Sequence, residues 1–350
     1  MTTEEMIRAA KDAIGSGRTD DYVIQPTKHA AELLDKAPSL AAMLGSSELS
    51  VLAGEYEKKD KEAKGNKNVF MITANRANWA VLLTACFSTL LLVVAPLKAA
   101  TGLPDAVILA VLGVCGVISG GLGSMWVYQA REGRLLDNWM SARAAAEALR
   151  TQYFETATGM ELPDGNSPIP TALLQFEYFR RYQLDVQIAF YERKAQDLRR
   201  DADRLLRTGA FSVALASISA GLAAILGGQR PAWVSVAALG AIATALGSFA
   251  ATRESVNQSR RNMERYTKAC EAISLLKRKL DPVRAAAAAG DKQPMKQFIA
   301  AVHEQLTAEH REWLAAAQSI QPAIDRLEDT LAKLKPKPAD AQPAANVPSH

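Results

Sequence analysis

The sequence contains few residues of the kinds that carry enzyme chemistry. Only three of its 350 residues are cysteines. Cys86 and Cys115 lie in apolar runs and Cys270 in a charged segment, without the spacing of a metal or redox site. Such cysteines are typical of a reducing compartment. The chain also lacks a glycine-rich phosphate loop with its lysine, a GxSxG elbow and an HExxH motif, so we expect no catalytic or cofactor site.

Histidines are equally scarce, with four in the chain. His29 and His350 are isolated, whereas His303 and His310 are seven residues apart and share a helical face with neighbouring glutamates. The surrounding residues alternate as they do on a solvated helix, so we predict no metal site there.

Charged residues are absent from four long stretches. In chain order these are Ala77 to Leu97, Ala106 to Ala130, Thr208 to Gln229 and Pro231 to Thr252. A helix of 21 residues, the shortest of these lengths, spans roughly 32 Å at about 1.5 Å per residue, enough to cross a hydrocarbon core of ~30 Å. None of the four contains a histidine either, which argues against a proton pump or an ion-coupled transporter.

The four stretches form two close pairs. Only Lys98 to Asp105 separates the first two, and only Arg230 separates the second two. We therefore predict an all-α membrane protein with two transmembrane helical hairpins, four spans in all, that long cytoplasmic helices extend into a helical bundle.

Basic residues flank the hairpins and predict their orientation. The flanks carry 21 Lys and Arg residues, whereas the two short turns contain only Lys98 and Arg230. Both termini are therefore expected in the cytoplasm, with the flanks facing anionic lipid headgroups of a bacterial inner membrane. No secretory signal is visible, so the first hairpin is expected to direct its own insertion. Acidic residues interrupt the basic flanks and no aromatic-basic motif accompanies them, so we predict no nucleic-acid binding.

The predicted organisation has six parts. They are an N-terminal cytoplasmic helical segment (1–50), a first two-span unit with helical flanks (51–157), a linker (158–170), a second two-span unit (171–280), a C-terminal cytoplasmic helical segment (281–334) and a disordered tail (335–350). Within residues 1–50, Thr3 to Ile14 and Thr27 to Leu44 are expected to be short helices that pack on the bundle, or that offer a surface to a regulator. Pro322 is expected to kink or interrupt the C-terminal helix.

The two units look like a duplication. With an offset of 124 residues, Leu122-Gly123-Ser124 aligns with Leu246-Gly247-Ser248, and Asn138 aligns with Asn262. Both units enter and leave the membrane on the same side, so the repeat is parallel and not inverted.

Small and weakly polar residues recur at helical spacing in the spans. The candidate packing or pore-lining residues are Gly113, Gly116, Ser119, Gly120, Gly123, Ser124, Ser217, Gly221, Gly240, Thr244 and Ser248. Small residues let helices approach closely in lipid, so one interpretation is packing within the two hairpins. The other is that some of these residues contact other subunits or line an aqueous path. Such a neutral path would discriminate little among ions.

One charged helix resembles a known family. Residues Asn138 to Leu149 read NWMSARAAAEAL and follow the first pair of spans, and residues Phe298 to Leu306 and Glu309 to Trp313 follow the second. With the basic helix that leads each pair, they resemble the SLATT family, the SMODS- and SLOG-associating two-transmembrane effector domains of bacteria. The resemblance covers roughly residues 55 to 155 and 175 to 315. It implies a membrane effector of conflict systems that a nucleotide-signalling or sensor partner activates, and it carries no catalytic residues.

From these observations we expect a homo-oligomeric, pore-forming or depolarising effector of a prokaryotic antiphage or conflict system. Two alternatives stay open. The hairpins of a non-conducting scaffold would anchor helices that dock cytoplasmic partners, and a soluble toxin would hide its hairpins until it meets a target.

Overall fold

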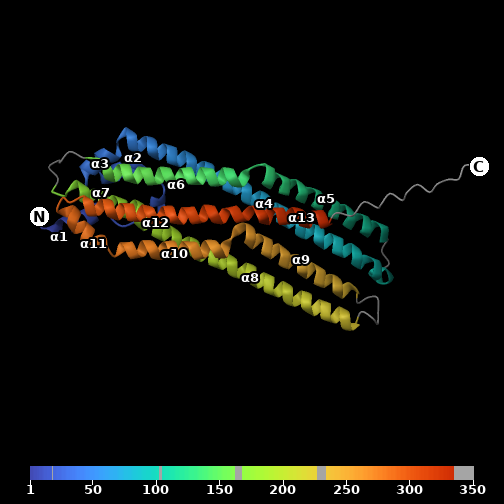
Figure 1. Ribbon diagram of the computed structural model, residues 1–350. Coiled ribbons are helices and arrows are strands. Elements are labelled where there is room, and N and C mark those ends of the chain that lie inside the picture. The colour runs from blue at the N-terminus through green and yellow to red at the C-terminus, as the bar shows by residue number, and fades with distance from the viewer. Residues whose placement is uncertain (18, 102–104, 162–167, 227–233, 335–350) are drawn as a thin grey trace, which may run out of the picture. The chain divides into compact units, whose positions relative to one another are not determined.

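The computed structural model describes residues 1–17, 19–101, 105–161, 168–226 and 234–334 (Figure 1). These residues form helices joined by short connections, and no strand occurs among them. The predicted all-α fold class is therefore confirmed for this part of the chain. Parts of the predicted linker 158–170 and of the first hairpin turn lie outside the described residues. So do the second turn, Arg230, the adjoining ends of the last two predicted spans and the whole predicted tail 335–350.

The described residues separate into two compact units. The first, called here the charged unit, consists of residues 1–70, 134–202 and 258–318; the second, the apolar unit, consists of residues 71–133, 203–257 and the described residues from Ser319 on. The charged unit contains α1 (Thr3–Ile14), η1 (Thr19–Tyr22), α2 (Pro26–Leu33), α3 (Pro38–Leu44), the start of α4 (Ser47–Thr101), α6 (Leu135–Gly159), α7 (Thr171–Phe179), η2 (Arg180–Asp185), the start of α8 (Val186–Leu226), α10 (Ser259–Lys277), α11 (Leu280–Ala288) and α12 (Gln293–Ala317). The apolar unit contains the remainder of α4 and α8, with α5 (Asp105–Glu132), α9 (Val234–Asn257), η4 (Gln318–Ile320) and α13 (Gln321–Leu334).

Helix α7 is the centre of the charged unit. Its sequence is apolar nearly all round, as expected of a buried helix, and every residue from Ala172 to Phe179 is buried. It contacts α1, α3, α6 and α11 (Figure 1). Aromatic pairs link α7 to α6 and to α12: the ring of Phe179 lies 6.0 Å from that of Phe154 on α6, and Phe176 lies 5.5 Å from Phe298 on α12.

The N-terminal helices pack on this core. Helix α1 has the predicted bounds and begins with a capping box, in which Thr2 Oγ1 accepts from the backbone N–H of Glu5 at 3.3 Å. The predicted single helix Thr27 to Leu44 is instead two helices, α2 and α3. Pro38 explains the difference, because a proline disfavours the helical conformation in the residue before it, and α3 begins at Pro38 itself.

Helices of the apolar unit belong to the stretches that are candidates to cross a membrane. Three helical stretches are long and apolar enough: Val107–Gly159, Thr171–Ile225 and Val236–Lys277. Each overlaps most of one of the last three predicted spans, which begin at Ala106, Thr208 and Pro231. The first predicted span, Ala77 to Leu97, lies in α4 but is not among them, and the side chains of residues 92–97 lie outside the description. Four spans thus stay a prediction.

The helix that leaves each hairpin is broken in the same way. Arg134 (φ 49°) and Gln258 (φ 50°) are the two non-glycine residues with positive φ in the described chain, and each lies between the second helix of a hairpin and the helix that follows. Each of these residues accepts, through its carbonyl, the backbone N–H of the asparagine four residues on, at 2.9 and 2.8 Å. Arg134 and Gln258 are 124 residues apart, which is the offset of the predicted duplication.

The C-terminal segment is interrupted at the expected proline. Helix α12 ends at Ala317, a short 3-10 turn follows, and Pro322 occupies the first turn of α13. The sequence placed 281–334 in one cytoplasmic segment, whereas the structure groups the residues from Ser319 on with the apolar unit.

Candidate functional site

Three glycines of α5 face α4 in the first hairpin. A methyl group added at Gly116 would lie 3.7 Å from Phe87 Cβ, one at Gly120 would lie 3.7 Å from Thr84 Cγ2, and one at Gly123 would lie 3.0 Å from Ala80 Cβ. The spacing of these glycines by four and three residues puts them on one face of α5. The absence of side chains on this face lets the two backbones approach, as small residues do in membrane helices.

A buried pair of hydroxyl groups joins the same two helices. Thr84 Oγ1 lies 2.9 Å from Ser119 Oγ, and each hydroxyl also reaches a carbonyl of its own helix, Ala80 O at 2.8 Å and Gly116 O at 3.0 Å. These are three hydrogen-bond contacts, but the two hydroxyl groups have only two hydrogens to donate. Each group can donate either along its helix or across to its neighbour, and neither is left without a partner.

The second hairpin repeats this register. A methyl group at Gly240 would lie 3.2 Å from Ser219 Cβ, and one at Gly247 would lie 3.4 Å from Ser212 Cβ. Gly240 and Gly247 correspond to Gly116 and Gly123 at the offset of 124 residues. Their partners Ser219 and Ser212 correspond to Phe87 and Ala80 at a common offset of 132. The equivalent contacts support a duplication of the two-span unit.

The other candidate residues do not contact the partner helix of their hairpin in this way. A methyl group at Gly113 or Gly221 would meet nothing within 4 Å. Ser217, Gly221, Thr244 and Ser248 are exposed. The hydroxyls of Thr244 and Ser124 donate to carbonyls of their own helices, Gly240 O at 2.9 Å and Gly120 O at 3.0 Å. The structure therefore divides the eleven candidates into a group within the hairpins and a group on their surface.

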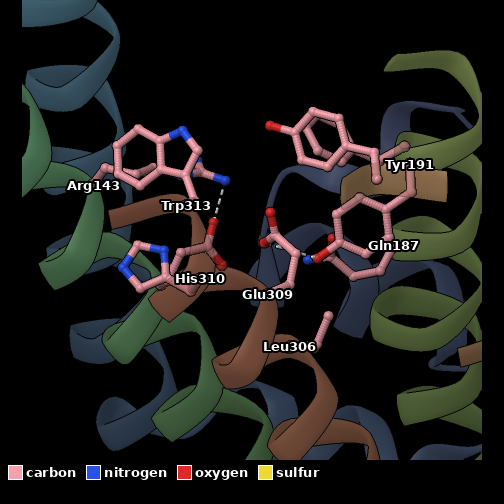
Figure 2. A pocket seen from close by; sticks show the side chains of 10 residues that line it. Arg143, Gln187, Tyr191, Leu306, Glu309, His310 and Trp313 are labelled. Carbon is pink, nitrogen blue, oxygen red and sulfur yellow. Dashed lines mark hydrogen bonds and ion pairs between the residues drawn. The ribbon is translucent and has the colours of Figure 1, made fainter. Parts of the chain in front are cut away.

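The charged unit encloses a small polar cavity of about 40 Å³ (Figure 2). Its lining includes Glu309, His310 and Trp313 on α12, Arg143 on α6 and Tyr191 on α8. Glu309 Oε2 accepts from Tyr191 Oη at 3.4 Å, the other oxygen of Glu309 accepts from Arg265 Nε at 2.9 Å, and His310 stacks on Trp313 at 5.7 Å. The volume suits one or two water molecules and is far too small for a nucleotide.

Burial shifts the titration of two of these groups. It raises the pKa of Glu309 above its ordinary value, because the carboxylate is desolvated more than the nearby Arg265 compensates. It lowers the pKa of His310, which favours the neutral ring. His303 also has a lowered pKa through burial, and it lies 3.2 Å from Glu155. Among the described residues, no group of three or more His, Cys, Asp or Glu is arranged to hold a metal.

A wider hollow of about 390 Å³ lies between α10 and α12. Arg261, Arg265 and Lys268 line it together with Glu264 and Glu312. Since basic and acidic groups alternate there, the hollow has no dominant charge to select an ionic ligand.

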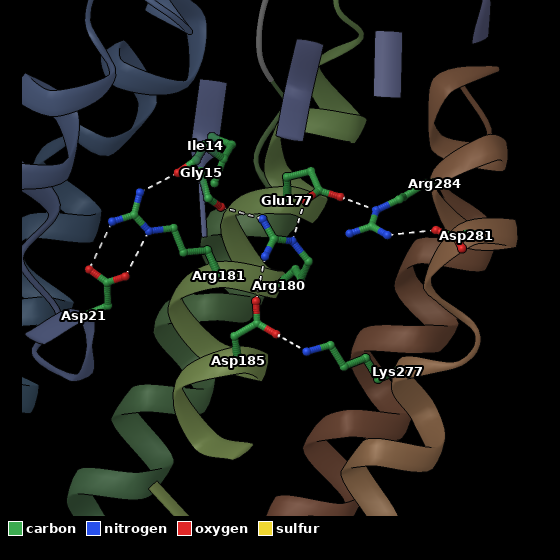
Figure 3. Close-up of polar contacts among 10 residues, drawn as sticks. All are labelled: Ile14, Gly15, Asp21, Glu177, Arg180, Arg181, Asp185, Lys277, Asp281 and Arg284. Atoms are coloured by element: carbon green, nitrogen blue, oxygen red, sulfur yellow. Dashed lines mark hydrogen bonds and ion pairs between the residues drawn. The ribbon is translucent and has the colours of Figure 1, made fainter. Parts of the chain in front are cut away.

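A network of buried arginines holds the N-terminal segment against the centre of the charged unit (Figure 3). Two of its arginines, Arg180 and Arg181, lie on η2, a short π-helix that continues α7. Arg180 donates to Gly15 O at 2.7 Å, and Arg181 donates to Ile14 O and to both oxygens of Asp21 at 2.9 and 3.2 Å. The two guanidinium groups therefore supply donors to carbonyls at the C-terminal end of α1, which lack partners within that helix.

The same network ties α7 to α11. Glu177 is fully buried, and its two oxygens accept from Arg180 Nε at 2.5 Å and from Arg284 Nε at 2.6 Å. Asp185 accepts from Arg180 at 2.6 Å and from Lys277 at 2.9 Å. Every charge that Figure 3 draws thus has a partner of opposite sign or a carbonyl.

Sequence analysis did not identify this network or the fully buried Arg150, which donates to Gln183, Tyr22, Tyr56 and Tyr182. One signal was present: Glu177, Arg180 and Arg181 interrupt the apolar stretch from Leu173 to Leu184. Charges on an otherwise apolar helix are buried only when they are paired.

Comparison with protein families gives a match around the second hairpin. Residues 179–313 match the family described as SMODS and SLOG-associating 2TM effector domain 1 (SLATT_1). The predicted resemblance is confirmed for this stretch, which extends from the last residue of α7 through the second hairpin to α12. The match implies a two-span effector domain of antiphage or other conflict systems. The match does not include the predicted first two-span unit, residues 51–157. No curated protein and no solved structure matched the chain.

Proposed function

We propose that this chain, whose residues 179–313 form the matched effector domain, is a membrane effector of a prokaryotic antiphage or conflict system. It oligomerises in the inner membrane and permeabilises or depolarises it when a sensor or a nucleotide-signalling partner triggers it. The match across the second hairpin is the observation that carries this proposal. The protein acts without catalysis, and both of its termini lie in the cytoplasm beside the basic flanks.

The surface of the second hairpin supports self-association. Ser217 and Gly221 are one turn apart on α8, Thr244 and Ser248 are one turn apart on α9, and all four are exposed. In lipid, small residues on an exposed helix face favour close contact with another helix. These faces are therefore available to neighbouring subunits.

The chemistry of the spans favours leak over selective conduction. The four uncharged runs contain no Asp, Glu, Lys, Arg or His, so a path between them offers ions neutral groups and no charged side chain. Selective filters instead use rings of carbonyls or of charged side chains.

The test is depolarisation of cells that express the protein, measured with a voltage-sensitive dye. Gly221→Leu should reduce the dye signal, because the larger side chain obstructs contact between subunits while the chain's own hairpin has open space there. Gly121→Leu is the matched control, since Gly121 on α5 also has nothing within 4 Å. Membrane fractionation should show equal insertion of both variants.

Two outcomes would contradict the proposal. If the native protein leaves the membrane potential unchanged at every expression level, both alone and in cells that carry its neighbouring genes and are challenged with phage, the chain is a non-conducting scaffold. If Gly221→Leu and Gly121→Leu depolarise cells as the native protein does, the exposed face of α8 is not the contact between subunits.

A further inference from the structure

Helix α13 lies outside the matched effector domain, which ends at residue 313. It is amphipathic: Ala323, Ile324, Leu327 and Leu331 are all at most 3% exposed, whereas Arg326, Glu328, Asp329 and Lys333 on the other side are exposed. The helix contacts both α5 and α9, the second helices of the two hairpins (Figure 1). It therefore occupies a position between the hairpins.

Two contacts define how α13 runs along α5. Arg131 Nη1 donates to Glu328 Oε2 at 2.7 Å, and a methyl group added at Gly123 would lie 3.2 Å from Leu331 Cδ2. Since Gly123 precedes Arg131 by eight residues, it is displaced by about 12 Å along the helix axis. The C-terminal turn of α13 thus lies antiparallel to α5 and beside the uncharged run that ends at Ala130.

The charges of α13 require a polar environment at this level. Asp329 and Lys333 lie within one turn of Leu331, so they are at the same level along α5, but on the exposed side of α13. Ionised groups at such a level in a membrane face a water-filled cavity or extend to the headgroups, because hydrocarbon excludes them. The exposed side of α13 therefore faces water or headgroups, while its apolar side covers α5 and α9.

We propose that α13 is a plug that closes the cytoplasmic end of the path between the hairpins. This inference rests on the proposed function, because a plug matters only if the hairpins form a path. The apolar side of α13 seats Leu331 against Gly123, and its charged side faces water. Release of α13 from α5 and α9 opens the path, and the pair of Arg131 and Glu328 at the exposed edge breaks at the same time.

The first experiment weakens the packing of α13 on α5. Leu331→Asp places a carboxylate against Gly123, where the native side chain is 3% exposed, and should displace α13. The inducer concentration at which cells lose their potential should then fall by about tenfold, the change expected from losing the burial of one leucine. Asp329→Lys is the control: it changes an exposed residue of the same helix and should behave as the native chain does.

The second experiment holds the plug in place. Arg131→Cys and Glu328→Cys are combined in a chain whose Cys86, Cys115 and Cys270 are replaced by alanine. A short bis-maleimide joins the two new thiols. Both positions are about half exposed, so the substitutions leave the packing intact. The linked protein should no longer depolarise cells, whereas treatment with a monofunctional maleimide should leave the dye signal unchanged.

The outcomes separate the two proposals. The plug is contradicted, and the proposed function is not, if the native chain depolarises cells while Leu331→Asp has the native threshold or the linked protein stays active. If the native chain, Leu331→Asp and the unlinked double-cysteine chain all leave the potential unchanged, both proposals fail.

Discussion

The buried carboxylate of Glu177 should stabilise the charged unit far more than an exposed carboxylate on the same arginine. Arg284 donates to Glu177 at 2.6 Å and to Asp281 at 2.9 Å. The side chain of Glu177 is 0% exposed and that of Asp281 is 85% exposed. Glu177→Gln leaves two buried guanidinium groups without their shared charge, and removal of one partner from a buried ion pair costs about 3–5 kcal/mol. Asp281→Asn should cost about 0–1 kcal/mol, because solvent screens an exposed pair.

The assay is chemical unfolding of the full chain in detergent, followed by far-ultraviolet circular dichroism. A double-mutant cycle with Arg284→Met measures the coupling directly, and it should be about 1–3 kcal/mol for Glu177 and close to zero for Asp281. Equal losses for Glu177→Gln and Asp281→Asn, or no coupling between Glu177 and Arg284, would refute the argument that the burial of this network makes it stabilising.

Three further predictions concern pH, helix packing and the N-terminal segment. Burial lowers the pKa of His303 and His310, so the folded state favours their neutral rings. The stability that this contributes is present above about pH 6.5 and is lost as the pH falls, because the unfolded chain then binds more protons. The double variant His303→Gln/His310→Gln should therefore show a flatter decrease of the unfolding free energy between about pH 7 and about pH 5. Gly240→Ala should lower stability in detergent relative to Gly221→Ala, because only at position 240 does the added methyl group meet a neighbouring helix, Ser219 Cβ at 3.2 Å; equal stabilities would show that the second hairpin relaxes freely. Asp21→Asn should speed hydrogen exchange in α1, since it removes the buried carboxylate that pairs with an arginine of η2, and unchanged exchange would show that the backbone contacts suffice.

Local patterns predicted the helices and most of the candidate spans. The uncharged runs have the length and composition of membrane helices, and Pro322 has the expected effect on the C-terminal helix. These features depend on neighbouring residues alone. The split of Thr27 to Leu44 into α2 and α3 also has a local cause, Pro38, which the sequence analysis did not weigh.

The buried network and the position of α13 depend on contacts between distant residues. Arg181 and Asp21 are separated by 160 positions, and Arg131 and Glu328 by 197. No periodic pattern in the sequence predicts such pairs, because each charged residue by itself is typical of a solvent-exposed helix face. The left-handed conformation of Arg134 and Gln258 was also unpredictable, since neither residue type favours positive φ. Only their separation of 124 residues indicates that these two helix breaks occupy equivalent positions in the duplicated unit.

The repeated register of the two hairpins has a consequence for the oligomer proposed above. Two hairpins on one polypeptide meet at an effective concentration of about millimolar, set by their connection and not by expression level. If the proposed oligomer is a ring, it needs half as many separate encounters as a ring of single-hairpin proteins with equal circumference. Because the two hairpins are similar but not identical, neighbouring positions around that ring alternate, and a substitution in one hairpin alters every second position.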